Sequence, residues 1–282
     1  MGSSPSLFVC GAPVTPGGLP PQKALMTQRA VFTEAYAVIP RGCMTDIVTS
    51  ALPGWTGMRM WVLARPLTGF AETFSHYLTE LAPGGGSDAP ESDAAAQSIL
   101  YVVEGGLRLT IDGTAQDLGP GGYAWIAPGA DWALASEAGA RLHWIRKRWI
   151  PAPGATASVS FVTHEDEATT TAMPDTDGRW TTTRFVDPAD MAHDCHVNLV
   201  TFEPGGTIPF EETHVMEHGL FVLEGKAVYK LNRDWVEVEA GDFLWLRAFC
   251  PQACYAGGPG RFRYLLYKDV NRHAALGGTF GI

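Results

Sequence analysis

Two stretches of this sequence share one pattern: LYVVEGGLRLTIDG at residues 100–113 and LFVLEGKAVYKLN at residues 220–232. Each holds two short apolar runs separated by Glu-Gly, which is typical of a β-hairpin with a glycine at its turn. A Pro-Gly-Gly turn precedes each stretch, at 83–85 and 204–206, and a glycine followed by an aromatic-rich run comes after it, at 122–126 and 241–246. Because order and spacing agree, the chain contains an internal repeat of roughly 100 residues.

The rest of the chain predicts the same kind of structure. Short apolar or alternating runs recur between glycines and prolines, of which there are 32 and 20. A helical period sustained over about 12 residues is hard to find. The sequence therefore predicts an all-β protein made of two small barrels or jelly rolls in tandem.

Composition shifts indicate how the chain is divided. Residues 1–26, rich in Gly, Pro and Ser, are expected to form a flexible arm, and the polar stretch 151–180 is expected to link two domains. The predicted domains are then 27–150 and 181–282.

Charge and composition narrow the function classes. The 282 residues carry a net charge of −10 without a basic run, which disfavours nucleic acid and anionic membranes as partners. The sequence shows neither a signal segment nor a run of about 18 apolar residues. Five cysteines form no disulfide framework, so reduced thiols and a cytoplasmic protein are expected.

The chemistry is concentrated in Glu212-Thr-His214-Val-Met-Glu-His218. On a helix, the two histidines would share one face as in HExxH zinc sites, but Val215 stands where that motif needs its glutamate. On a strand, Glu212 and His214 share one face, and His218 opens the next strand after a short turn. The glycines and proline before this segment favour the extended structure. The alternative is a pair of core histidines with incidental neighbours.

The spacing resembles the cupin motif. Five residues separate Gly206 from Glu212, three separate His214 from His218, and six separate His218 from Gly225, as in cupins. The residue types are permuted, because Glu takes the first ligand position and His the third. In the second cupin motif the last ligand follows its glycine by eleven residues. Counting from Gly241 gives Gln252, although Arg247 and Phe249 replace the usual Pro and Gly of that motif.

These donors suit a catalytic metal. Imidazole and oxygen donors fit divalent ions such as Mn²⁺, Fe²⁺, Ni²⁺ or Zn²⁺, and the absence of a cysteine ligand disfavours a closed structural zinc site. The predicted metal ligands are Glu212, His214, His218 and Gln252.

The first copy lacks this set. Depending on the spacing chosen, the corresponding positions carry Ser98, Ala94 and Ser92, or Asp93 and Glu91, with Ala133 as the fourth. The N-terminal domain is therefore expected to be metal-free and to serve packing or oligomerisation.

The C-terminal part also resembles one particular family. HGLFVLEGKAVYKL from 218, the PQACYA run from 251 and RYLLYKDVNR from 263 are similar to (S)-ureidoglycine aminohydrolases, bicupin enzymes of allantoin degradation, and the likeness extends from about residue 27 to the end. It implies Mn²⁺ on the four ligands named above, substrate contacts from Tyr264 and Lys268, and hydrolytic release of ammonia from (S)-ureidoglycine. It also implies a homo-oligomer that binds a small molecule.

The residues agree with this resemblance. Tyr264 and Lys268 face one side of a strand, and a buried lysine needs an anion, which the substrate carboxylate supplies. We expect Glu212 and Gln252 to contact the substrate as well. Glu217 has odd parity relative to the ligands and is expected to point away from them. The alternative is that Tyr264 belongs to the core and Lys268 is a solvated charge at the strand end.

Other functions stay open from the residues alone. A metal-dependent cupin dioxygenase or isomerase uses a similar site, although an Fe²⁺ dioxygenase more usually carries three His and one Glu. A non-catalytic, small-molecule-binding bicupin would usually lack the ligand set.

Overall fold

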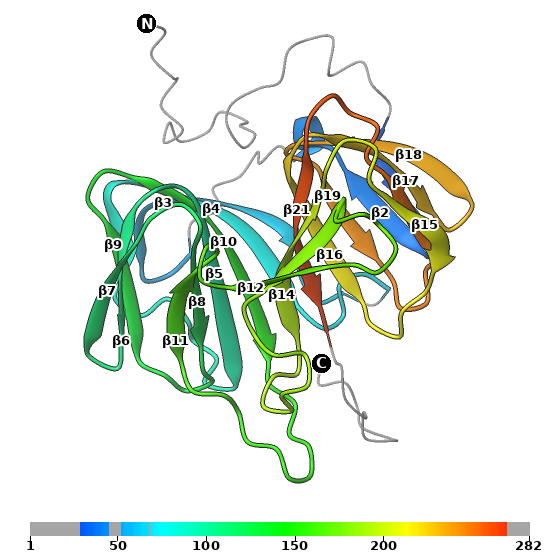
Figure 1. Ribbon diagram of the computed structural model, residues 1–282. Coiled ribbons are helices and arrows are strands. Elements are labelled where there is room, and N and C mark those ends of the chain that lie inside the picture. The colour runs from blue at the N-terminus through cyan, green and yellow to red at the C-terminus, as the bar shows by residue number, and fades with distance from the viewer. Residues whose placement is uncertain (1–28, 45–51, 68, 270–282) are drawn as a thin grey trace, which may run out of the picture. The chain divides into compact units, whose positions relative to one another are not determined.

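The structure, a computed structural model, describes residues 29–44, 52–67 and 69–269. In these residues the regular structure is β-strand, apart from one three-residue 3-10 turn, η1 (Arg41–Cys43). The chain divides into two compact units, each built of antiparallel strands. The prediction of an all-β protein with two tandem units is therefore confirmed (Figure 1). No helix in the described residues is long and apolar enough to cross a membrane.

The first unit comprises Met44–Arg65 and Phe74–Glu167 among the described residues. Its strands are β3 (Trp55–Ala64), β4 (Ser75–Ser87), β5 (Ala96–Gly105), β6 (Leu107–Ile111), β7 (Thr114–Leu118), β8 (Gly122–Ile126), β9 (Trp132–Ser136), β10 (Ala140–Arg148) and β11 (Phe161–His164). They form one sheet in the order β11-β8-β5-β10-β4-β9-β6-β7, with β3 beside β4. Strand β4 pairs with β10 through its first half and with β9 through its last residues, so it joins the two walls of the barrel.

Aromatic rings fill the interior of this first barrel. The Trp55 and Trp132 rings lie 5.4 and 5.9 Å from the Trp144 ring, centroid to centroid, and Tyr77 lies 5.3 Å from it. All four side chains are buried together with aliphatic residues of every wall. The first barrel is thus a packed core.

Among the described residues, the second unit combines 29–43, the segment Pro66–Thr73 and 168–269. Its strands are β1 (Val31–Phe32), β2 (Tyr36–Ile39), β12 (Thr169–Ala172), β13 (Trp180–Arg184), β14 (His196–Phe202), β15 (Thr207–Glu212), β16 (His218–Glu224), β17 (Lys226–Leu231), β18 (Asp234–Glu239), β19 (Phe243–Leu246), β20 (Gln252–Tyr255) and β21 (Phe262–Lys268). An eight-stranded sheet, β1-β2-β19-β16-β21-β14-β13-β12, and a four-stranded sheet, β15-β20-β17-β18, share one apolar core.

The boundary predicted for the first domain is wrong on its N-terminal side. Strand β2 pairs with β19, with Tyr36 opposite Leu246 and Ile39 opposite Phe243, so this early segment completes the sheet of the second unit (Figure 1). The Tyr36 side chain is 1% exposed in that unit's core, and its hydroxyl donates a hydrogen bond to Asp234 at 2.7 Å. Sequence patterns describe local structure and carry no signal for this long-range pairing.

The predicted linker is also shorter than expected. Within 151–180, β11 pairs with β8 of the first unit, and β12 pairs with β13 of the second. Both strands are short and polar, which is why composition alone marked them as linker. The predicted arm, residues 1–26, lies outside the described residues.

The glycine shared by the two Glu-Gly turns has a steric reason. Gly105 and Gly225 have φ of +71° and +79°, in the left-handed region that glycine adopts most readily. A Cβ atom at either position would also lie 2.1 Å from a backbone oxygen, that of Gly139 or of Arg261. The repeated hairpin therefore requires glycine at this position in both units.

Candidate metal centre and substrate cavity

Three of the four predicted ligands lie at strand ends of the second unit. Glu212 ends β15 and Gln252 begins β20, and the two residues are direct partners in this antiparallel pair. His218 begins β16, and His214 lies in the short connection before it. Because paired residues project their side chains to the same face, the predicted spacing brings Glu212 and Gln252 together.

The His218 imidazole is suited to bind a metal. The side chain is buried, and its Nε2 atom has no hydrogen-bond partner. Burial, with Lys268 and His214 nearby, holds the His218 pKa well below its usual value, so the ring is neutral. The other ring nitrogen bonds the Met216 backbone. A neutral histidine held through one nitrogen presents the lone pair of the other, which a metal ion needs.

The remaining donors lie close by but are arranged differently from a coordinated set. The His214 Nε2 atom contacts the Glu212 carboxylate at 3.3 Å, and the His214 and His218 rings lie 5.0 Å apart. In the described part of the chain, no three His, Cys, Asp or Glu side chains are grouped so that they could hold a metal ion as they stand. The Glu212 carboxylate would have to turn from His214 toward an ion. The donor types and the unpartnered Nε2 atom nevertheless fit a divalent metal.

A cavity of about 310 Å³ contains all four predicted ligands, together with Tyr264 and Lys268. Lys268 is the direct partner of His218 on one side and of His196 on the other, so these three residues form a row across β16, β21 and β14. Both predicted substrate-contacting residues therefore line the same cavity as the predicted ligands.

Burial shifts the pKa of both of these residues. Burial is the largest influence on the Lys268 pKa and lowers it; the Glu212 charge opposes this shift, and the weaker influence of Arg184 adds to it. Burial raises the pKa of Tyr264 well above its usual value, so its hydroxyl keeps its proton. The cavity thus holds a partly desolvated amine and a protonated phenol that can donate a hydrogen bond.

The same cavity contains further polar residues that the sequence did not single out, among them Arg184, His196 and Asn198. His196 and Asn198 alternate along β14 with the apolar Val197 and Leu199, and this alternation was the available signal. Burial, followed by charges that include Lys268, lowers the His196 pKa to about 4.

Glu217 points away from the cavity, as its parity indicates, but it is not a surface group. Its carboxylate accepts hydrogen bonds from the backbone amides of Glu72 and Thr73 and from the Trp245 indole at 2.6 Å. Glu217 therefore anchors the segment Pro66–Thr73 to the second unit.

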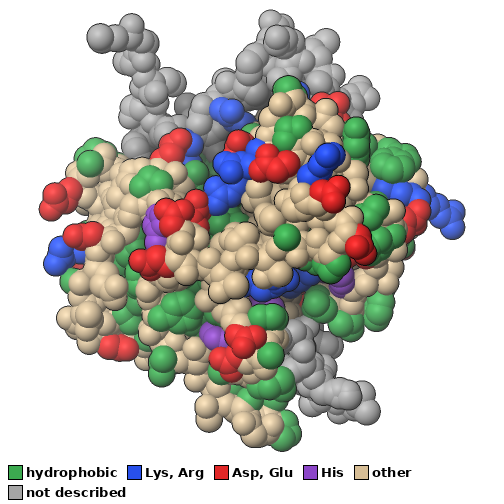
Figure 2. Space-filling model, viewed as in Figure 1, with side chains coloured by type: hydrophobic (Ala, Val, Ile, Leu, Met, Phe, Trp, Pro, Cys, Tyr) green, Lys and Arg blue, Asp and Glu red, His purple; other side chains and the backbone are tan. Residues whose placement is uncertain are grey.

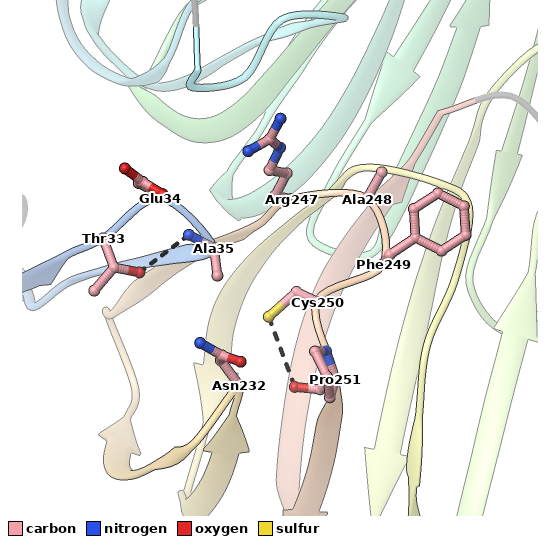
Figure 3. A pocket seen from close by; sticks show the side chains of 9 residues that line it. All are labelled: Thr33, Glu34, Ala35, Asn232, Arg247, Ala248, Phe249, Cys250 and Pro251. Atoms are coloured by element: carbon pink, nitrogen blue, oxygen red, sulfur yellow. Dashed lines mark hydrogen bonds between the residues drawn. The ribbon is translucent and has the colours of Figure 1, made fainter.

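A second hollow of the same unit, about 510 Å³, contains none of the predicted site residues (Figure 3). One wall is the loop Arg247–Pro251 between β19 and β20, where Phe249 takes a φ of +66°. The Phe249 amide donates a hydrogen bond to the His214 carbonyl at 2.6 Å. This loop therefore ties the segment of His214 to the start of the Gln252 strand.

The chain is similar to known proteins over most of its length. The model of the cupin domain matches residues 77–146 and 198–267. The (S)-ureidoglycine aminohydrolase of Arabidopsis thaliana is 33% identical over 87% of this chain and 79% of its own length, and that of Escherichia coli is 28% identical over 89% and 95%. A solved structure from Pseudomonas aeruginosa, named "Putative Glyoxylate Induced Protein", is 65% identical with a TM-score of 0.86, covering 94% of this chain and 98% of that one.

Because the cupin domain matches once in each unit, the protein is a bicupin. Its sequence identity with the (S)-ureidoglycine aminohydrolases extends over most of this chain and of theirs. The chain therefore belongs to that family of bicupins.

Proposed function

We propose that this protein is a hydrolase that releases ammonia from (S)-ureidoglycine and yields (S)-ureidoglycolate. Family membership supports this activity. The observation that supports a site for it is the cavity of the second barrel, which contains Glu212, His214, His218 and Gln252 together with the partly desolvated Lys268. The substrate is a small anion, and such a cavity suits it in both size and charge.

The proposed cofactor is Mn²⁺, with another divalent ion as a possible substitute. The ion would be held by Glu212, His214, His218 and Gln252. Binding would give the His218 Nε2 atom, which has no hydrogen-bond partner, a ligand role. When bound, the ion supplies Lewis acidity and a fixed point for the substrate.

The chain's own residues position the reactant. We assign Lys268 to the substrate carboxylate, because a buried ammonium needs an anionic partner. Tyr264, which keeps its proton, donates a hydrogen bond to the substrate from the same strand face. Glu212 and Gln252, paired across β15 and β20, border the substrate from the opposite sheet.

The reaction replaces one bond at a single carbon. Water adds its oxygen to the carbon as the bond from that carbon to the amine nitrogen breaks, and the amine leaves as ammonia with a proton from water. The same carbon carries the ureido nitrogen, so the site must select the leaving group and the face on which water enters. A rigid barrel interior gives this selectivity by holding one geometry.

A direct assay tests the proposal. Ureidoglycine is generated in situ from allantoate, and ammonia release is followed with the metal-loaded protein. We expect release well above the spontaneous rate and a product of S configuration. Release at the spontaneous rate, with metal content verified, would overturn the assignment.

Assembly and compartment are proposed on separate grounds. Phe210, Trp235 and Tyr255 on the four-stranded sheet are 57%, 65% and 50% exposed, and a second copy covering them would make a homo-oligomer. The four described cysteines are free, which supports a cytoplasmic location. On the face in Figure 2, acidic side chains lie beside the basic ones, as expected of a protein that binds neither nucleic acid nor membranes. Sedimentation velocity measures the assembly.

A further inference from the structure

Asn198 is a residue of the cavity to which the proposed function assigns no role. It lies on β14 and lines the cavity, and only 5% of its surface is exposed. Its Oδ1 atom is buried without a hydrogen-bond partner. A buried acceptor left unsatisfied costs about 1–3 kcal/mol, so its retention beside a cavity indicates that a ligand satisfies it.

Arg184 stands next to Asn198. The two residues are direct partners across β13 and β14, and both line the cavity. Arg184 is near enough to Lys268 and His196 to lower their pKa values. One edge of the cavity therefore presents a donor, the guanidinium, beside an acceptor, the amide oxygen.

This pair does not suit a carboxylate alone. A carboxylate has only acceptor atoms, so the Asn198 oxygen would repel it. A terminal carbamoyl group carries a carbonyl oxygen and an NH₂ group side by side, and these complement an adjacent donor and acceptor. The carboxylate has a separate partner in Lys268, on the row of His196 and His218.

We propose that Asn198 and Arg184 form the specificity subsite for the carbamoyl end of the substrate, in which Asn198 Oδ1 accepts a hydrogen bond from the ureido NH₂ group and Arg184 donates one to the ureido carbonyl oxygen. The inference rests on the proposed function and deepens it. Asn198 is then a specificity-determining residue, and the site recognises ureido acids rather than small carboxylates in general.

The test compares two ligands of the metal-loaded protein. (S)-Ureidoglycolate carries both a carboxylate and a carbamoyl group, whereas glycolate carries the carboxylate without the carbamoyl group. Binding is measured by calorimetry for the wild type, Asn198→Leu, Asn198→Asp and Lys268→Met. Leu closely matches the shape of Asn but cannot accept a hydrogen bond, while Asp keeps the acceptor.

We expect Asn198→Leu to lose about 10–100-fold in affinity for ureidoglycolate and less than about threefold for glycolate. Lys268→Met should weaken both ligands to a similar extent, and Asn198→Asp should keep more of the preference for ureidoglycolate than Asn198→Leu does. Metal content and thermal midpoint verify that each variant is folded. If Asn198→Leu does not fold, the preference measured for Asn198→Asp and for Arg184→Met, which removes the donor, decides the question.

The outcomes separate the two proposals. A wild type with no preference for ureidoglycolate, or an Asn198→Leu variant that keeps the wild-type preference, overturns the subsite even if the enzyme releases ammonia from ureidoglycine. A protein that shows the preference and loses it in Asn198→Leu, yet releases no ammonia, supports the subsite and overturns the proposed reaction.

Discussion

The two barrels use equivalent positions for opposite purposes. Ser98 lies opposite Arg146 in the first unit, at the place where His218 lies opposite Lys268 in the second. The Ser98 hydroxyl accepts a hydrogen bond from the Trp144 indole at 3.0 Å, whereas the His218 Nε2 atom has no partner. At this position the first barrel satisfies its polar side chain internally, whereas the second leaves the His218 Nε2 atom available.

The cations differ in the same way. The Arg146 guanidinium is bonded through two nitrogens to the Glu91 carboxylate, and it also lies 5.4 Å from the Trp144 ring. Lys268, its counterpart, lies in the cavity. The equivalent cation is therefore paired among aromatic rings in the first barrel and lines a cavity in the second.

The strongest test makes the second barrel like the first. Replacing His218 with Ser, the residue of the first unit, should reduce bound metal and lower kcat/KM more than about 100-fold, because even changes around a ligand cost about 10–100-fold. Elemental analysis and the ammonia assay measure both. The reverse change, Ser98→His, is the matched control and should create no metal site, since Trp144 and Arg146 occupy the surroundings. Stoichiometric metal in His218→Ser would contradict the ligand assignment.

A pair of charge removals sharpens the comparison. Lys268→Met should lower kcat/KM about 10–100-fold, the loss expected for one charge-assisted hydrogen bond, and should change stability little. Arg146→Met should leave kcat/KM nearly unchanged but lower the free energy of unfolding by about 1–3 kcal/mol, because the Glu91 side chain is 7% exposed and loses its partner. Denaturant titration and kinetics give the two values. If Lys268→Met and Arg146→Met lowered kcat/KM equally, the two cations would not differ in their roles.

The turn glycines should show where the barrels are alike. Gly105→Ala and Gly225→Ala should each destabilise by about 2 kcal/mol or more, since left-handed backbone costs an L-residue about 1–2 kcal/mol and the Cβ atom clashes as well. Gly113 shares the conformation, with φ of +80°, but has nothing within 4 Å of its Cβ position. Gly113→Ala is therefore the control for strain without a clash, and thermal melts of all three variants compare the costs. Identical shifts would mean that the close approach contributes nothing.

The smallest effect is expected at Phe249, where the cupin motif has glycine. Phe249→Gly relieves a left-handed phenylalanine but gains backbone entropy in the unfolded chain, so stability should change by less than about 1 kcal/mol. Phe249→Pro also removes the amide that bonds the His214 carbonyl, and it should lower metal affinity. Metal titrations distinguish the two variants, and equal affinities would show that the loop does not hold the ligand segment.

Much of this structure follows from counting along the sequence. The Glu-Gly hairpins, the proximity of the four predicted ligands and the shared face of Tyr264 and Lys268 all depend on local spacing, which the strand period converts directly into side-chain direction. The fourth ligand position, Gln252, looks like an ordinary loop residue until the interval from Gly241 is applied, and the structure places it opposite Glu212.

What could not be predicted depends on contacts between distant segments. Asn198 and Arg184 belong to strands outside the motif, and only the pairing of β13 with β14 brings them to the cavity. Likewise, the burial of Glu217 depends on Glu72 and Thr73, over 140 positions earlier in the chain. Neither arrangement has a signature in spacing.

The early strand β2, seated at β19, has a consequence for synthesis. Among the described strands, translation produces β1 and β2 first, then those of the first barrel, and only later β19, the partner of β2, and β21. The sheet that carries His218 and Lys268 therefore cannot be completed on a partly made polypeptide. The ribosome releases a chain whose first barrel can already be folded, while the second barrel closes last, so a prematurely terminated product would lack the cavity that contains the predicted metal ligands.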